Sequence, residues 1–126
     1  MSKNYADIGA AYYTAWGEKN VAAMGVLLHP DVQIIGPLAE TVGKEVILEG
    51  LRRGAAHFNT LNIRAKFSSG DQAMVVLDLH SPAPVGITRS ASLLTFRDGL
   101  IAKIELFFDA SPMQNMKEKI WKKSNS

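Results

Sequence analysis

The sequence predicts an α+β fold, in which three helices pack on a strongly curved, mainly antiparallel sheet and form a cone with an internal pocket. Apolar residues recur at helical spacing as far as about residue 58, and at the strand spacing of two from there to residue 109. The pair Asp98-Gly99 is a strong hairpin signal, so the strands on either side of it are antiparallel neighbours. Each helix has a single apolar stripe, so all three must lie on one face of the sheet.

Composition predicts one soluble domain over residues 1–126. The chain is 47% hydrophobic and 21% charged, which is ordinary for a globular domain. The lack of cysteine excludes disulfides, zinc–thiolate sites and a thiol nucleophile. No stretch approaches the roughly 20 apolar residues of a membrane span, and residues 1–16 hold no apolar run of signal-peptide length. We therefore expect a cytoplasmic protein that does not bind membranes.

The positive charge is concentrated near the C-terminus. The net charge is +2, and residues 111–126 hold four lysines and one glutamate, hence +3, which leaves −1 for the rest. A nucleic-acid-binding protein gathers Lys and Arg on one face, and no such cluster is evident. The sequence therefore predicts a basic tail at residues 111–126 and no nucleic-acid partner.

Two helices are predicted at the start of the chain, the first over residues 5–19. Asn20 suits the N-cap of the second, and Pro30 ends it because the residue before a proline avoids helical geometry. Leu27 and Leu28 would then lie on the buried side of the second helix. The stripe of the first helix comprises Tyr5, Ile8, Tyr12, Ala15, Trp16 and Lys19.

A short strand at residues 31–35, broken by Gly36-Pro37, leads to a third helix at residues 43–58. The wet side of this helix carries Glu49 and Arg53 at i,i+4, an ion pair worth about 0.3 kcal/mol. Its apolar stripe comprises Ile47, Leu48, Leu51, Ala55 and Phe58.

Four strands are predicted in the second half of the chain, at residues 61–68, 73–80, 87–96 and 100–109. Ser69-Gly70-Asp71 is a turn, and two prolines interrupt the chain at residues 81–84. The first of these strands should have one dry face along its whole length, made by Leu61, Ile63, Ala65 and Phe67.

The order of several short motifs resembles the nuclear transport factor 2-like superfamily. They are residues 29–32 (HPDV), 43–45 (GKE), 94–101 (LTFRDGLI) and 105–109 (ELFFD), within a resemblance that covers about residues 5–110. Relatives include ketosteroid isomerases, SnoaL-like polyketide cyclases and scytalone dehydratases. The resemblance implies the cone fold and says little about function, because one cone hosts many chemistries.

The same resemblance implies that ketosteroid isomerase activity is absent. The isomerases use a tyrosine, a carboxylate base and a protonated aspartic acid. The tyrosine falls on Tyr12, but the base falls on Gly36 and the aspartic acid on Ser92. The acid of SnoaL-like cyclases falls on Leu106, so that constellation is missing as well.

The alignment with this superfamily also implies which side chains face the pocket. Most of them are apolar, which indicates a small hydrophobic ligand, and we expect no cofactor. The pair Asp78 and His80 lacks a third ligand, so we expect no metal site. The implied pocket residues are Tyr12, Trp16, Gly36, Ile47, Leu51, Val75, Leu77, Leu79, Ser90, Ser92, Leu94, Ile104, Leu106 and Phe108.

Two classes of function stay open. The first is a non-catalytic protein that binds a small hydrophobic molecule in the pocket. The second is a SnoaL-like or dehydratase-type enzyme (isomerase, cyclase or lyase) in which Tyr12 donates a hydrogen bond and an unidentified group is the base. His57 could be that base at the pocket mouth, or simply a histidine favoured by a helix C-terminus. Ser90 and Ser92 either bind a polar group of the ligand or bond to their neighbours.

The outer face of the sheet is predicted to form a homodimer. A strand with one solvent-exposed face should alternate apolar and polar residues, but the middle strands are apolar on both faces. A second subunit, or the tail at residues 111–126, must therefore cover this face. The outward residues are Met74, Val76, Ala91, Leu93, Thr95 and Phe107, with Asp78, His80, Arg89, Lys103 and Glu105 as the polar part.

Overall fold

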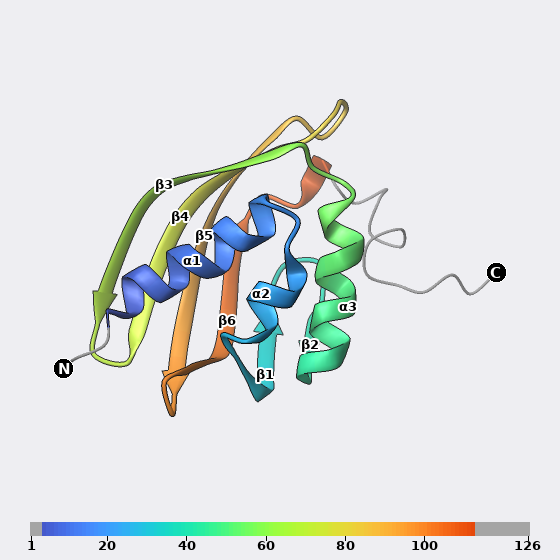
Figure 1. Cartoon of the computed structure of the whole chain (residues 1–126). Coiled ribbons are helices and arrows are strands. Elements are labelled where there is room, and N and C mark those ends of the chain that lie inside the picture. The colour runs from blue at the N-terminus through green and yellow to red at the C-terminus, as the bar shows by residue number, and fades with distance from the viewer. Residues whose placement is uncertain (1–3, 113–126) are drawn as a thin grey trace.

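The computed structural model describes residues 4–112, which form a curved six-stranded sheet with three helices on its concave face (Figure 1). This architecture confirms the predicted α+β cone. We call the face that carries the helices the inner face and the opposite one the outer face. The elements are α1 (Tyr5–Gly17), α2 (Val21–Gly25), β1 (Leu28–Ile35), β2 (Glu40–Val42), α3 (Lys44–Ala55), β3 (Thr60–Ser69), β4 (Gln72–His80), β5 (Ile87–Arg97) and β6 (Leu100–Phe108).

The strand order is β2-β1-β6-β5-β4-β3. Neighbouring strands are antiparallel except β1 and β6, which are parallel. Within residues 4–112 no helix is long and apolar enough to cross a membrane. Of the predicted basic tail, residues 113–126 lie outside the described range.

Local signals in the sequence place the helix starts and the tight turns. The side chain of Asn20 accepts a hydrogen bond from the first turn of α2, which confirms the predicted cap, and Asn4 does the same for α1. Asp98 and Gly99, between β5 and β6, have φ of 57° and 79°, as the predicted hairpin requires. The pair Glu49–Arg53 is present on α3 at 3.6 Å.

The predicted end of the second helix is wrong. This helix ends at Gly25, and Leu28 opens β1 instead of closing the helix. Pro30 lies inside β1, where the pairing with β6 is irregular between Leu28 and Gln33. A proline costs no ladder hydrogen bond in such an irregular stretch, so it does not stop the strand. The edge strand β2 was not predicted, because its three residues carry no periodicity.

The predicted single dry face of the strand at residues 61–68 is also wrong. The pairing of β3 with β4 shifts by one residue between Ile63 and Ala65. Beyond this bulge Ala65 and Phe67 lie on the outer face, and Phe67 is 61% exposed. Lys66 turns to the inner side instead and pairs with Asp7 of α1. A one-residue shift exchanges the faces because side chains alternate along a strand.

The core lies between the helices and the inner face of the sheet. Val75 is opposite Ser92, and Leu94 is opposite Ile104, in the register that the alternation predicts. α1 lies directly against the sheet at Gly9, where a Cβ would lie 2.8 Å from Leu94 Cδ1 and 3.0 Å from Val75 Cγ2. A side chain at this position would have to displace Leu94 and Val75, so glycine permits the close contact between α1 and this part of the sheet.

Candidate functional site

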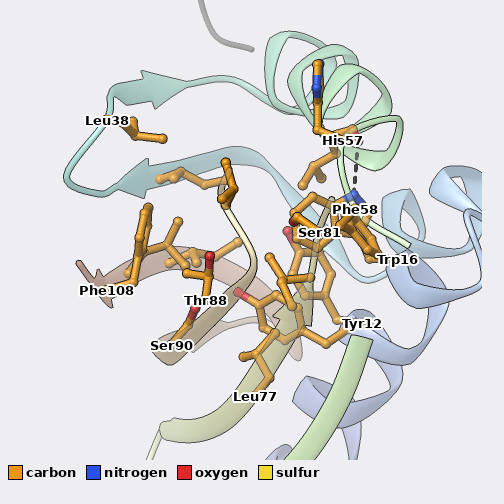
Figure 2. A pocket seen from close by; sticks show the side chains of 18 residues that line it. Tyr12, Trp16, Leu38, His57, Phe58, Leu77, Ser81, Thr88, Ser90 and Phe108 are labelled. Atoms are coloured by element: carbon orange, nitrogen blue, oxygen red, sulfur yellow. Dashed lines mark hydrogen bonds between the residues drawn. The ribbon is translucent and has the colours of Figure 1, made fainter. Parts of the chain in front are cut away.

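A cavity lies between the helices and the inner face, beside the C-terminal half of α1 (Figure 2). Its volume is about 120 Å³, counted as the space that the centre of a water molecule can occupy. This is room for several waters or one small organic molecule. In Figure 2, Thr88, Ser90 and Phe108 form one wall, and Trp16 and Phe58 lie across from them. The walls are largely apolar and aromatic.

Ten of the sequence-predicted site residues line this cavity. They come from α1, from α3 and the turn that follows it, and from the inner face of β4, β5 and β6. They are Tyr12, Trp16, Leu51, His57, Leu77, Leu79, Ser90, Ile104, Leu106 and Phe108.

Five other predicted pocket residues lie elsewhere. Val75, Ser92 and Leu94 are completely buried where α1 touches the sheet, and Ile47 of α3 is part of the same core. Gly36 lies at the end of β1, where a Cβ would lie 3.2 Å from Leu106 Cδ1, so the Leu106 side chain covers it. The physical reason is that α1 fills one end of the inner face and leaves the other end hollow.

Eight lining residues were not predicted. Thr88 shares a strand face with Ser90 and Ser92, so the alternation of β5 carried enough signal to find it. Most of the others belong to helix positions outside the apolar stripes or to loops, where periodicity is no guide. The full set is Tyr13, Ile34, Leu38, Gly54, Phe58, Ser81, Val85 and Thr88.

Two adjacent tyrosines differ in their hydrogen bonding. The Tyr13 hydroxyl donates to Ser92 Oγ at 2.7 Å. Burial raises the pKa of Tyr13, and the bond to Ser92 lowers it only in part. Burial also raises the pKa of Tyr12, and the neighbouring Tyr13 adds to this. Both rings therefore stay neutral near pH 7.

The Tyr12 hydroxyl has no hydrogen-bond partner within residues 4–112, and neither do the hydroxyls of Ser81, Thr88 and Ser90. In that range Asp78 Oδ1, on the outer face, is the one completely buried polar side-chain atom without a hydrogen-bond partner, so the four hydroxyls are not completely buried. All four residues line the cavity, and Thr88 also lines a second hollow beside Ile87 and Arg89.

Hydrogen bonds link the α3 end of the cavity to Trp16 of α1 and to Lys19, which follows α1. Trp16 Nε1 donates to the Leu51 carbonyl at 3.0 Å. The Lys19 ammonium donates to the carbonyls of Ala55 and Phe58, and lies 3.2 Å from the centroid of the Phe58 ring. Partial burial lowers the pKa of Lys19. Lys19 thus adds a cation at the C-terminus of α3, whose last turn already carries Arg52 and Arg53; sequence reasoning considered this role for His57.

His57 follows the end of α3 and lines the cavity edge. In Figure 2 its imidazole points away from Tyr12 and Thr88. Among the described residues that line the cavity there is no carboxylate and no lysine or arginine. The residues 4–112 also hold no group of three or more His, Asp or Glu side chains placed to bind a metal ion. The arrangement offers neutral hydrogen-bond donors within an apolar wall.

The chain belongs to the SnoaL-like domain family, which matches residues 10–104. This match, together with structures of the same fold, confirms the nuclear transport factor 2-like superfamily. No curated protein matches the chain.

Three solved structures illustrate the breadth of the fold. A steroid delta-isomerase from Pseudomonas aeruginosa has a TM-score of 0.77 at 19% identity, with 95% of this chain and 90% of that chain covered. A putative polyketide cyclase from Sinorhizobium meliloti has a TM-score of 0.73 at 22% identity, with 80% and 94% covered. A protein of ketosteroid isomerase-like fold from Catenulispora acidiphila, in complex with trimethylamine, has 0.72 at 24%, with 88% and 92% covered.

These likenesses show the fold alone, so the question of isomerase chemistry rests on this chain's own residues. Ser92, at the aspartic acid position, is buried and accepts the bond from Tyr13. Gly36, at the base position, has no side chain to accept a proton. The absence of ketosteroid isomerase activity stays a prediction.

Proposed function

We propose that this protein binds a small hydrophobic molecule in the cavity beside Tyr12 and Trp16. The observation that carries this proposal is a partly open cavity with largely apolar walls in a chain of 126 residues. Sites for small molecules are typically concave, mostly apolar and aromatic, with a few polar groups. A cavity of about 120 Å³ is therefore a feature that a ligand would explain.

Indane, a compact bicyclic hydrocarbon, is a suitable first probe because it needs no polar partner. We expect saturable binding by calorimetry and a rise in Tm that grows with indane concentration. Leu106→Trp should abolish binding, because the larger ring fills the cavity that Leu106 lines. Val46→Trp, on the exposed side of α3, is the matched control and should bind indane normally. Equal binding by both variants would contradict the proposal.

Catalysis is the second candidate function, and the open, neutral Tyr12 hydroxyl favours it. Such a donor can stabilise negative charge on a carbonyl oxygen as a proton moves. The base is unidentified, since His57 is the one basic side chain among the described lining residues and its imidazole points away from Tyr12. Loss of a turnover in both Tyr12→Phe and His57→Gln, with ligand affinity retained, would favour the enzyme over the binding protein.

We also propose that the protein is a homodimer through the outer face of the sheet. Two features support this. The bulge in β3 adds Phe67 to the predicted apolar surface, and the carboxylate of Asp78 lies 4.0 and 3.8 Å from Arg64 and Arg89, too far for a hydrogen bond. A second copy would cover the apolar part and bring further donors. The apolar surface comprises Phe67, Met74, Val76, Ala91, Leu93 and Phe107.

Light scattering at micromolar concentration should report about twice the chain mass of 13.7 kDa. Leu93→Glu should halve that value, because it places a charge in the middle of the apolar surface. Val46→Glu on α3 is the control and should leave the mass unchanged. A monomeric wild type would overturn the dimer and favour the tail at residues 111–126 as the cover.

A further inference from the structure

Four hydroxyl groups without a partner among the described residues interrupt the apolar wall of the cavity, and together they indicate the chemistry of its ligand. Thr88 and Ser90 lie on the same face of β5, two residues apart and so roughly 7 Å from each other along the strand. Tyr12 comes from α1, and Ser81 from the loop that follows β4. Within the described chain none of the four hydroxyls has a protein partner, and all four residues line the cavity.

Ser92 shows that this is not a general property of hydroxyls on β5. It faces the same side as Ser90, and its Oγ accepts a bond from Tyr13. Buried polar groups are normally satisfied in this way, because an unpaired donor or acceptor costs free energy. Thr88 is almost completely buried and yet has no partner in the described residues. It lines this cavity and also a second hollow beside Ile87 and Arg89, so a molecule in the cavity or water can supply the partner.

The charge of the residues that line the cavity limits the class of ligand. Its described lining holds no carboxylate, lysine or arginine, and His57 is the one side chain that can become a cation. The nearby Lys19 ammonium is already engaged with two carbonyls at the end of α3. The His57 imidazole points away from Thr88 (Figure 2), so a carboxylate or phosphate buried beside the β5 hydroxyls would have no counter-charge there and would be costly to bind.

We propose that the cavity selects a neutral molecule with an apolar body and one oxygen function, a carbonyl or a hydroxyl, held by the hydroxyl of Thr88 or of Ser90. This inference rests on the proposed binding function and adds the class of ligand. Tyr12 and Ser81 are further hydroxyls of the same cavity and are available to a second polar group of the ligand. Ordered water is the competing occupant of all four groups.

Three compounds with one skeleton separate these possibilities: indane, 1-indanone and indane-1-carboxylate. One added hydrogen bond should make 1-indanone bind about three- to tenfold more tightly than indane. The carboxylate should bind at least about tenfold more weakly than the ketone, because its charge would be buried unpaired. Calorimetric titration of the full chain measures all three affinities.

Substitutions on β5 then test whether Thr88 and Ser90 cause the preference for 1-indanone over indane. Thr88→Val and Ser90→Ala together should reduce the affinity for 1-indanone to that for indane and leave indane binding unchanged. Thr88→Ser, which keeps a hydroxyl, should retain part of the preference for 1-indanone over indane that Thr88→Val removes. A purely structural effect would not give this difference. Thr60→Val, at the exposed start of β3, is the matched control. Circular dichroism and Tm report whether each variant is folded.

Each outcome decides a separate point. Equal affinity for indane and 1-indanone in the wild type would overturn the polar subsite while the binding function stands, and would favour water as the partner of these hydroxyls. A preference that survives the double substitution would overturn the assignment to Thr88 and Ser90. Tight binding of the carboxylate would overturn the exclusion of anions. Failure of all three compounds to bind would overturn the inference together with the proposed function.

Discussion

The inner face of the sheet has two ends that share one sequence pattern and differ in what covers them. At the closed end α1 lies directly on the sheet, and Gly9 brings its backbone against Val75 and Leu94. At the open end the cavity separates α1 from the strands, and Tyr12 and Trp16 form part of its wall. Alternation along β4 continues through both ends without a change, and β5 and β6 pair regularly from Ser90 to Thr95, where a bulge follows.

Ser90 and Ser92 make the difference concrete. They are the same residue type on the same face of the same strand, two positions apart. Ser92 is fully buried and bonded to Tyr13, whereas Ser90 lines the cavity with its hydroxyl open. The comparison teaches that strand alternation identifies the inner face, and that helix placement decides whether a residue there becomes core or cavity wall.

The largest expected effect comes from truncating the same residue type at each end. Leu94→Ala at the closed end should lower the free energy of unfolding by about 3–4 kcal/mol, because it opens a void in a packed core. Leu106→Ala only enlarges an existing cavity and should cost about 1 kcal/mol. Urea denaturation monitored by circular dichroism measures both values. Equal costs would mean that the two ends are packed alike.

The two tyrosines provide a second, smaller test. Tyr13→Phe removes the only donor that the described residues give to Ser92, so it should destabilise the protein by about 1–3 kcal/mol. Tyr12→Phe removes a hydroxyl without a protein partner and should change stability by less than about 0.5 kcal/mol. The same denaturation experiment decides. A larger loss for Tyr12→Phe would place a structural hydrogen bond at the open end.

The smallest expected effect is a difference in alkaline stability. Burial raises the pKa of Tyr12 in the folded state above the ordinary tyrosine value of 10.0, so the folded chain keeps a proton that the unfolded chain releases. Its contribution to stability is therefore complete below about pH 10 and is lost as pH rises above that value. At pH 11 the wild type should lose about 1 kcal/mol more than Tyr12→Phe does, relative to pH 8. Parallel losses in the two proteins would show that Tyr12 ionises freely.

Local signals account for the parts of the fold that were predicted correctly. Asn20 caps α2, and Asp98-Gly99 forms the last hairpin, because such features depend on a few adjacent residues. The exchange of faces at Ala65 could not be predicted, since the register depends on the strand opposite and the residue pattern of β3 alternates without a break.

The candidate site was likewise predicted only in part. The aromatic and apolar residues of α1, β4 and β6 that line the cavity could be named from periodicity and from the family resemblance. Leu38, Ser81 and Val85 could not, because they belong to loops that only the folded chain brings to the cavity. The sequence also could not show that Thr88 lines the cavity while Ser92 is buried and bonded to Tyr13. Both facts depend on the residues that lie across from the strand.

By itself, therefore, the sequence determined the α+β pattern of helices and strands, which follows from repeats of two and of about 3.6 residues. The inner face of the sheet and the lack of isomerase carboxylates at Gly36 and Ser92 came from the family resemblance that the sequence carries. Only the tertiary structure decided where the inner face is filled and where it is hollow. The reason is that a void arises from the distance between elements far apart in the chain, and here that distance is set by the contact of Gly9 with the sheet.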